Sequence, residues 1–136
     1  MIVKTVKKHL DLERGGTLTA IEPMELFPIF PGLKRFYFIA SEPSIKKARA
    51  GHYHKIKKEA MFAVQGQILI SLKKGEQEEN FLLKNEPDDL EISVVYVPPG
   101  WWHEVSVFSE DAILGVLAST TYKEDMETQD NFEEIP

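Results

Sequence analysis

The sequence contains no cysteine, which excludes a disulfide framework and thiolate chemistry. It has no run of about 18 apolar residues, the length that a membrane-spanning helix needs, and its first residues lack the apolar region of a secretory signal. A net charge of −6 argues against general binding of nucleic acid. We therefore expect a cytoplasmic protein that binds neither membranes nor nucleic acid.

The chain is rich in short β-type segments separated by turn residues. Segments 34–40 and 91–97 are aromatic-rich or β-branched, and no stretch outside the termini has a helical period. Nine or ten such strands in 136 residues indicate one all-β domain, residues 1–136, for which we predict a jelly roll. Gln65-Gly66 fits a tight hairpin, and residues 125–136 fit a short helix or a loose tail. Open sheet edges invite pairing with a second chain, so we expect a homodimer.

Two histidines separated by one residue, His52 and His54, are the most informative feature of the chain. Alternate side chains of a strand share a face, so both imidazoles should enter one cavity, roughly 7 Å apart along the strand. An unperturbed pKa of about 6.5 suits imidazoles to taking up and returning a proton near neutral pH. We predict that both are catalytic, with His52 as the main base and His54 as its acid partner or a proton shuttle. The reverse assignment is almost equally open.

Two further residues could join the histidine pair. Pro98-Pro99-Gly100 forms a stiff turn ahead of His103, which could bring a third imidazole to the cavity. Glu59 has three interpretations: a metal ligand, a carboxylate that orients an imidazole and raises its pKa, or an exposed charge. Together with His52, His54 and His103 it would complete a set of three histidines and one carboxylate that suits Fe, Mn, Ni or Zn.

Basic and aromatic residues are candidates for binding a substrate. Arg35 and Tyr37 share a face of segment 34–40, and an inward-facing arginine would need an anion such as a pyrophosphate. The alternative is an outward pair on a solvated sheet. Trp101 and Trp102 point in opposite directions if the chain is extended, so one should pack in the core while the other could stack on a base or a sugar.

Several segments together resemble the cupin superfamily, and more closely its nucleotide-sugar 3,4-ketoisomerases, which convert dTDP-4-keto-6-deoxyglucose to the 3-keto isomer. The resemblance covers nearly the whole chain and rests on residues 14–22, 34–37, 49–55, 96–104 and 108–111. Three features depart from the family's pattern. Ala50 replaces a usual glycine, Glu59 stands where these metal-free isomerases usually carry glutamine, and residues 122–129 lack the family's arginine-bearing stretch.

The resemblance implies a cupin jelly roll (double-stranded β-helix) and a ketoisomerase that moves a carbonyl between C4 and C3 of a dTDP-4-keto-6-deoxyhexose through an enediol, with no cofactor. It assigns His52 and His54 to the paired catalytic positions, and we expect Tyr37 to donate to the enediolate oxygen. The residues expected to bind the nucleotide sugar are Arg35, Arg49, Lys55, Trp102 and His103. Two alternatives stay open: a metal-dependent cupin enzyme that acts on another small substrate through His52, His54, Glu59 and His103, and a non-catalytic sugar-binding cupin.

Overall fold

The structure, a computed structural model, describes residues 2–22, 32–41 and 49–136. Within these ranges the chain forms ten strands and one short helix: β1 (Ile2–Lys7), β2 (His9–Leu10), β3 (Thr17–Leu18), β4 (Arg35–Ala40), β5 (Arg49–His52), β6 (Glu59–Lys74), β7 (Gln77–Asn85), β8 (Glu91–Val97), β9 (Trp102–Phe108), β10 (Ile113–Ala118) and α2 (Tyr122–Thr128). No helix in the described ranges has the length and the apolar character that a membrane crossing requires.

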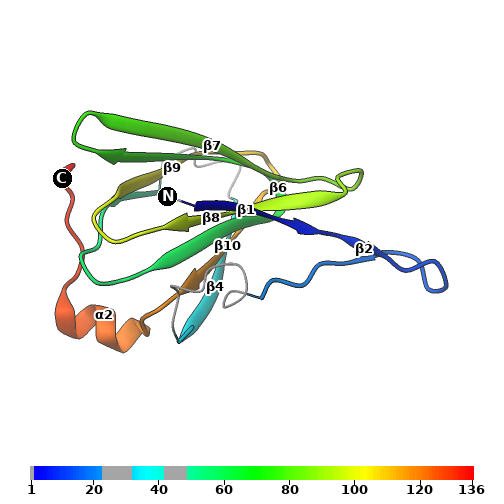
Figure 1. Ribbon diagram of the computed structural model, residues 1–136, viewed down its shortest axis with the longest axis horizontal. Helices are drawn as coiled ribbons and strands as arrows, with labels where there is room; N and C mark the ends of the chain where they lie inside the picture. The colour runs from blue at the N-terminus through cyan, green and yellow to red at the C-terminus, as the bar shows by residue number, and fades with distance from the viewer. Residues whose placement is uncertain (1, 23–31, 42–48) are drawn as a thin grey trace.

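Two antiparallel sheets form a sandwich, and one long strand belongs to both of them (Figure 1). The first sheet has the order β1-β8-β6-β10-β4, while β7, β9 and β5 extend the second half of β6 into the other sheet. The 16-residue strand β6 gives residues 59–65 to the first sheet and residues 66–74 to the second. This arrangement confirms the predicted all-β jelly roll.

The hairpin predicted at Gln65-Gly66 is wrong, because β6 continues through this point and passes from one sheet to the other. Gly66 has a φ of +79°, a left-handed conformation that glycine adopts without steric cost. A Cβ on Gly66 would lie 2.6 Å from Ser109 Oγ and 2.7 Å from the Cα of Ala112. The pairing with β10 also shifts register next to this point, as at a β-bulge. The turn-type residues therefore mark a bend within a strand.

Apolar side chains form two layers that hold the sandwich together. There are two layers because successive side chains of a strand point to opposite faces of its sheet. The inner layer lies between the sheets, and the second layer covers the outer face of the first sheet. Strand β8 supplies both, with Val95 and Val97 in the inner layer and Ile92, Val94 and Tyr96 in the outer one. The inner layer also forms the floor of a cavity, which is lined in part by Met61, Val105, Leu114 and Val116.

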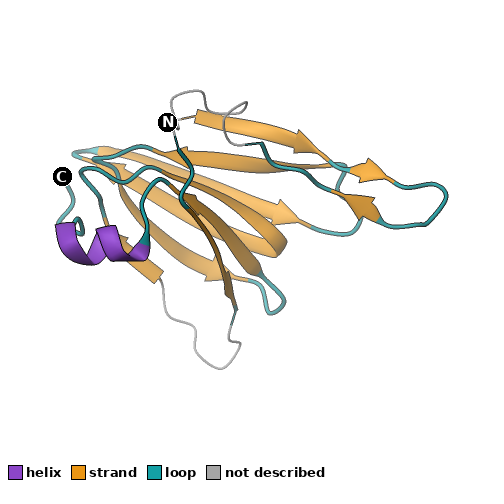
Figure 2. Cartoon of the chain, turned by 90° about the horizontal axis from the view of Figure 1, so that it is seen from below, coloured by secondary structure: helices purple, strands orange, loops and turns teal. Residues whose placement is uncertain are grey.

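Helix α2 closes the end of the sandwich that lies opposite the projecting β2–β3 arm (Figures 1 and 2). The helix begins at Tyr122, earlier than the predicted segment, and the Thr121 hydroxyl caps it by accepting the N–H of Glu124 at 3.1 Å. Gln129 ends the helix with a φ of 50°. This left-handed residue turns the chain back, and Phe132 then bridges Tyr53 through two backbone hydrogen bonds of 2.8 and 3.0 Å. The C-terminal segment is therefore attached to the chain at Tyr53, between the two histidines and directly after β5.

Candidate active site

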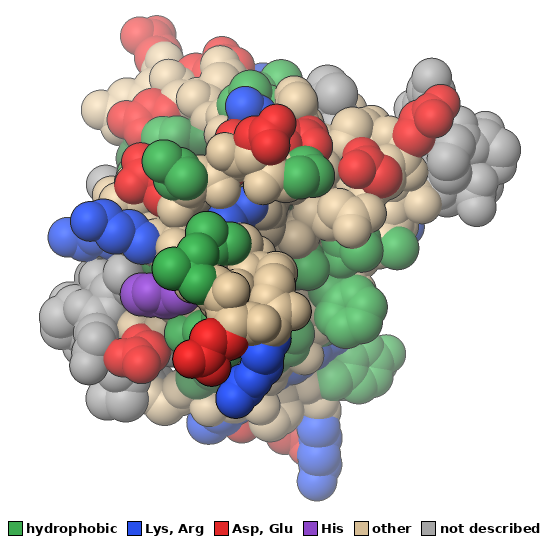
Figure 3. Space-filling view, turned by 90° about the vertical axis from the view of Figure 1, so that its right-hand side faces the viewer, with side chains coloured by type: hydrophobic (Ala, Val, Ile, Leu, Met, Phe, Trp, Pro, Cys, Tyr) green, Lys and Arg blue, Asp and Glu red, His purple; other side chains and the backbone are tan. Residues whose placement is uncertain are grey.

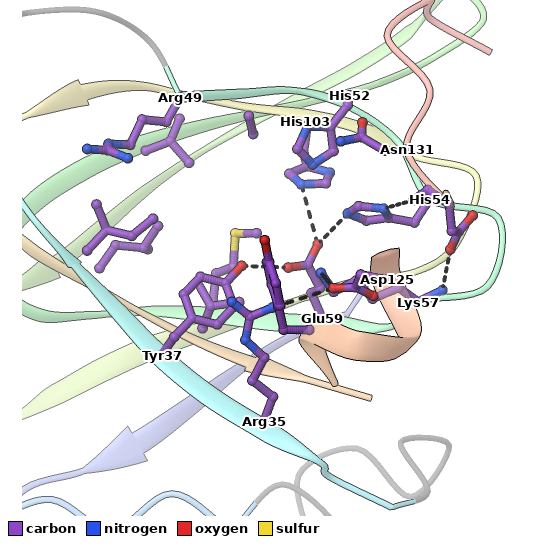
Figure 4. A pocket seen from close by; sticks show the side chains of 18 of the residues that line it. Arg35, Tyr37, Arg49, His52, His54, Lys57, Glu59, His103, Asp125 and Asn131 are labelled. Carbon is purple, nitrogen blue, oxygen red and sulfur yellow. Dashed lines mark hydrogen bonds and ion pairs between the residues drawn. The ribbon is translucent and has the colours of Figure 1, made fainter. Parts of the chain in front are cut away.

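A cavity of about 690 Å³ lies between the two sheets and is covered by α2 and the segment that follows it (Figure 4). Strands β4, β5, β6, β9 and β10 supply its walls. Its volume falls within the range of about 300–1,000 Å³ that is usual for small-molecule sites. Charged and aromatic side chains gather at its wall above the apolar floor, so the cavity suits a polar ligand.

Three imidazoles converge in this cavity, as predicted for His52 and His54 and as considered for His103. The ring centroids of His52 and His54 are 4.7 Å apart, and His103 lies 4.9 Å from His52 and 5.5 Å from His54. Strand β5 is irregular here: Ala50 and Gly51 have φ values of 68° and 77°, and the register with β9 shifts so that His52 faces His103. Strand β5 ends at His52, so the expectation that both histidines lie on one strand is wrong. His54 lies beyond the strand end, and its ring is closer to that of His52 than the roughly 7 Å of a regular strand.

Glu59 lies at the centre of the site and is only 2% exposed, so the interpretation as an exposed charge is wrong. Its Oε1 lies 3.2 Å from His54 Nε2 and 3.4 Å from His103 Nε2, and its Oε2 accepts the hydroxyl proton of Tyr37 at 3.1 Å. The His54 contact has the length of an ion pair but is out of line for a hydrogen bond. Burial alone would raise the pKa of Glu59, but the surrounding His54, His103 and Lys57 hold it at about 2. A permanent carboxylate thus faces two imidazoles.

The two predicted catalytic histidines have pKa values shifted in opposite directions. Burial, together with the neighbouring His103 and His54, lowers the pKa of His52 to about 4. Burial also opposes the charged form of His54, but Glu59 and the backbone carbonyl of Asp130 outweigh it and raise the pKa of His54 above 6.5. At neutral pH His52 is therefore neutral and can accept a proton, whereas the environment of His54 favours its charged, proton-donating form. Such a separation of two titratable groups is the pattern expected of acid and base partners.

A cluster of charges at the wall of the cavity includes residues that the sequence did not single out. Oδ2 of Asp125, on α2, accepts a hydrogen bond from the Lys57 ammonium at 2.9 Å and lies 3.4 Å from Nη1 of Arg35. The Arg35 guanidinium also lies 4.4 Å from the ring centroid of Tyr37 and 5.6 Å from that of Tyr122. No spacing in the sequence could have indicated Asp125, because α2 reaches the cavity only through the tertiary fold.

The remaining predicted residues divide into two groups. Arg49 lines the cavity, whereas Lys55 and Trp102 do not. The ammonium of Lys55 lies 4.3 Å from the ring centroid of Phe132, and the indole N–H of Trp102 donates to the backbone oxygen of Glu133 at 3.0 Å. The structure therefore does not bring Lys55 and Trp102 to the site where we expected them to bind a substrate.

Tyr37 lines the cavity, but its geometry does not fit the expected donor role toward a substrate. Its single phenolic proton is directed at Glu59 Oε2. Burial and the nearby Glu59 raise its pKa well above the usual range, so it keeps that proton at neutral pH. Tyr37 is therefore placed to hold the carboxylate of Glu59.

The histidine cluster also has the composition of a metal site. Ligand nitrogens of His52, His54 and His103 lie within 4.8 Å of one another, and imidazole is a common ligand of Zn and Fe. His54 Nδ1 contacts the carbonyl of Asp130, which is the type of contact that orients metal-binding histidines. These residues thus fit a divalent metal as well as direct proton transfer.

The fold and the site define a small β-sandwich protein with a histidine-lined cavity arranged for acid–base chemistry on a polar ligand. The family described as "FdtA: WxcM-like, C-terminal" matches residues 2–135, and the chain belongs to this family. A curated relative from Aneurinibacillus thermoaerophilus, a TDP-4-oxo-6-deoxy-alpha-D-glucose-3,4-oxoisomerase, is 30% identical over 83% of this chain and 76% of its own length.

Solved structures agree with this assignment. The QdtA 3,4-ketoisomerase from Thermoanaerobacterium thermosaccharolyticum, solved as a double mutant in complex with TDP, is 30% identical with a TM-score of 0.75 over 97% of this chain and 87% of that one. A TDP-quinovose 3,4-ketoisomerase from Campylobacter jejuni is 28% identical with a TM-score of 0.71 over 97% of this chain and 92% of its own.

Proposed function

We propose that the protein is a nucleotide-sugar 3,4-ketoisomerase that moves a carbonyl between C4 and C3 of a dTDP-4-keto-6-deoxyhexose. The observation that carries the proposal is the pair His52 and His54, whose rings share one cavity and whose pKa values are shifted in opposite directions. The relatives act on TDP-keto-sugars, and the cavity has room for a sugar ring. A protein that only binds a sugar does not need a proton donor and a proton acceptor side by side, because binding involves no proton transfer.

In the proposed reaction, each histidine handles protons of one kind. Neutral His52 removes the proton from C3, while His54 gives its Nε2 proton to the C4 oxygen, which produces the enediol. His52 then delivers its proton to C4, and the proton of the C3 hydroxyl goes to His54. The C3 oxygen becomes the carbonyl and both histidines return to their starting forms. The cycle needs no oxidant or reductant, because one carbonyl is lost as the other forms.

The diphosphate of the substrate would be held by cations at the wall of the cavity. Arg49 lines the cavity on β5, close in sequence to His52. Arg35 lies across the cavity on β4, where Tyr37 and Asp125 orient its guanidinium. A guanidinium binds phosphate oxygens through paired N–H groups, which fixes orientation as well as position. Buried His103 would support the sugar ring beside the catalytic pair.

We propose that this reaction proceeds without a cofactor. The second candidate function is a metal-dependent cupin enzyme, favoured by the convergence of ligand nitrogens from His52, His54 and His103. In that case these histidines, with Glu59 beside them, would hold a divalent ion that polarises a substrate oxygen. Metal analysis of untagged protein together with activity after chelation separates the two candidates. Full activity of metal-free enzyme contradicts the second, and activity lost on chelation and restored by metal contradicts the first.

The direct test of the function is incubation with dTDP-4-keto-6-deoxyglucose in D₂O, followed by NMR. We expect conversion to the 3-keto isomer. Deuterium at C4 would show that the proton on His52 exchanges with solvent before the transfer, and protium at C4 would show direct transfer from C3. Binding without product would instead support the non-catalytic sugar-binding alternative. Consumption of a different small substrate would support the metal-dependent enzyme.

We also propose that residues 1–136 act as one domain, and that the protein works in the cytoplasm as a homodimer. The β2–β3 arm projects away from the sandwich and carries Leu10, Leu12 and Leu18, which are 66%, 89% and 62% exposed (Figure 1). On this side of the molecule apolar side chains lie at the surface among charged ones (Figure 3). A second copy would cover such leucines. Light scattering of the wild type and of Leu18→Asp tests this: we expect a dimer that the substitution weakens, and a monomeric wild type contradicts the proposal.

A further inference from the structure

Asp130 ties the C-terminal segment to the turn that follows His54. Its Oδ1 accepts the backbone N–H of Lys55 at 2.6 Å, and its Oδ2 accepts those of Ile56 and Lys57 at 2.9 and 3.0 Å. Successive backbone N–H groups of this kind form an anion-binding concavity. Burial alone would raise the pKa of the Asp130 carboxyl, but these hydrogen bonds outweigh it and lower the pKa. The carboxylate is therefore a fixed anchor, and it is only 8% exposed.

The same residue contacts the catalytic histidine through its main chain. The backbone oxygen of Asp130 lies 2.5 Å from His54 Nδ1. A carbonyl oxygen can only accept a hydrogen bond, so Nδ1 must carry the proton in this contact. His54 Nε2 is then the nitrogen left to exchange protons, and it faces Glu59 beside the cavity. The contact thus selects which ring nitrogen takes part in the reaction.

We propose that Asp130 is a positioning residue: its side chain, anchored on the amides of residues 55–57, holds its own carbonyl against His54 Nδ1 and fixes the tautomer and the orientation of that ring. The carboxylate that binds the turn after His54 and the carbonyl that contacts the His54 ring belong to the same residue. The turn and the ring are therefore held in a fixed position relative to each other. The neighbouring bridge between Tyr53 and Phe132, whose ring centroids are 5.1 Å apart, holds the next part of the segment in place. The proposal deepens the proposed function, because it says how the acid partner is held.

Two substitutions test the proposal with different severity. Asp130→Ala removes all three hydrogen bonds to the turn, whereas Asp130→Asn keeps the size of the side chain but replaces one acceptor oxygen with a donor. We expect kcat to fall about 10- to 100-fold in Asp130→Ala, because misplacement of a catalytic group by about 1 Å can cost 10²-fold. Asp130→Asn should lie between this variant and the wild type. KM should stay within about twofold, since the Asp130 carboxylate is already bound to the backbone N–H groups of residues 55–57.

The matched control is Asp89→Ala. Asp89 also accepts a backbone N–H, that of Glu86 at 2.8 Å, and lies in the turn between β7 and β8, outside the lining of the cavity. A purely structural loss would lower the melting temperature in both Ala variants and leave kcat unchanged.

The decisive readout is NMR of the protein labelled with ¹⁵N in its histidine rings, with no substrate present. In the wild type we expect His54 to show a protonated Nδ1 whose proton exchanges slowly, and in Asp130→Ala that signal should be lost or averaged. A variant that keeps the signal and the wild-type kcat overturns the proposal. If Asp130→Ala does not fold, Asp130→Asn decides by the same criteria. If the wild type is not a ketoisomerase, the ring spectra still test the positioning, so the two failures can be told apart.

Discussion

Glu59→Gln should change the activity of the enzyme mainly on the alkaline side of its pH profile, and less at low pH. Activity requires neutral His52 and protonated His54. It should therefore rise through the pKa of His52, at about 4, and fall through that of His54, which lies above 6.5. Glu59 is the group that contributes most to raising the pKa of His54 against burial. Glutamine keeps the size of the side chain and an acceptor for Tyr37, but removes the charge.

The size of the effect follows from the distance between the charges. At 3.2 Å and an effective dielectric constant of about 20, an ion pair is worth at most about 5 kcal/mol. If a quarter of this interaction energy remains as its net effect on His54, the acid dissociation constant of His54 changes by a factor of about 10, since a tenfold change is about 1.4 kcal/mol. We therefore expect the pKa that governs the alkaline limb of kcat/KM to fall by about one unit or more in Glu59→Gln.

The assay is a full profile of kcat/KM from pH 4 to pH 9 for the wild type, for Glu59→Gln and for the control Glu110→Gln, whose carboxylate lies in the exposed turn before β10. The alkaline limb should move to lower pH only in Glu59→Gln. Superimposable alkaline limbs, in variants that melt at similar temperatures, would refute the assignment of His54 as an acid controlled by Glu59.

Three further substitutions test other parts of the structure. His52→Asn should lower turnover by about 10²- to 10⁴-fold while TDP binding by calorimetry is retained, and unchanged turnover would exclude the base role. Arg49→Ala should raise KM several-fold at nearly constant kcat and melting temperature; a lower melting temperature with unchanged KM would indicate a structural arginine. Gly66→Ala forces a Cβ against Ser109 and Ala112 and should lower the free energy of unfolding by about 1–3 kcal/mol in urea titrations. A wild-type value would mean that the bend of β6 adapts.

The sequence predicted the features that depend on local pattern. Alternating residues identified the strands, and the spacing of His52 and His54 placed both rings in one cavity. The bend at Gly66 was misread because a glycine after a polar residue is typical of a hairpin as well as of a bulge. Only the pairing of β6 with both sheets distinguishes the two, and pairing between distant strands leaves no local pattern.

The C-terminal segment shows a second limit of sequence reasoning. Asp125 and Asp130 lie in an acidic stretch that resembles an ordinary solvated surface. Their importance comes from the partners that the fold provides: the ammonium of Lys57 for Asp125, and the turn after His54 for Asp130. Lys55 and Trp102 illustrate the reverse case, because their neighbours in sequence line the cavity while their own side chains point elsewhere.

The opposite pKa shifts of the two histidines explain why tertiary contacts are needed in addition to the motif. If both had the same pKa, at most about a quarter of the molecules would combine a neutral His52 with a charged His54, and only at one pH. Glu59 and the carbonyl of Asp130 act on His54, whereas burial and two neighbouring imidazoles act on His52. Between the two pKa values most molecules then hold the productive combination. Residues from β6 and from the end of the chain thus give two similar side chains the different pKa values that the proposed mechanism requires of its base and its acid.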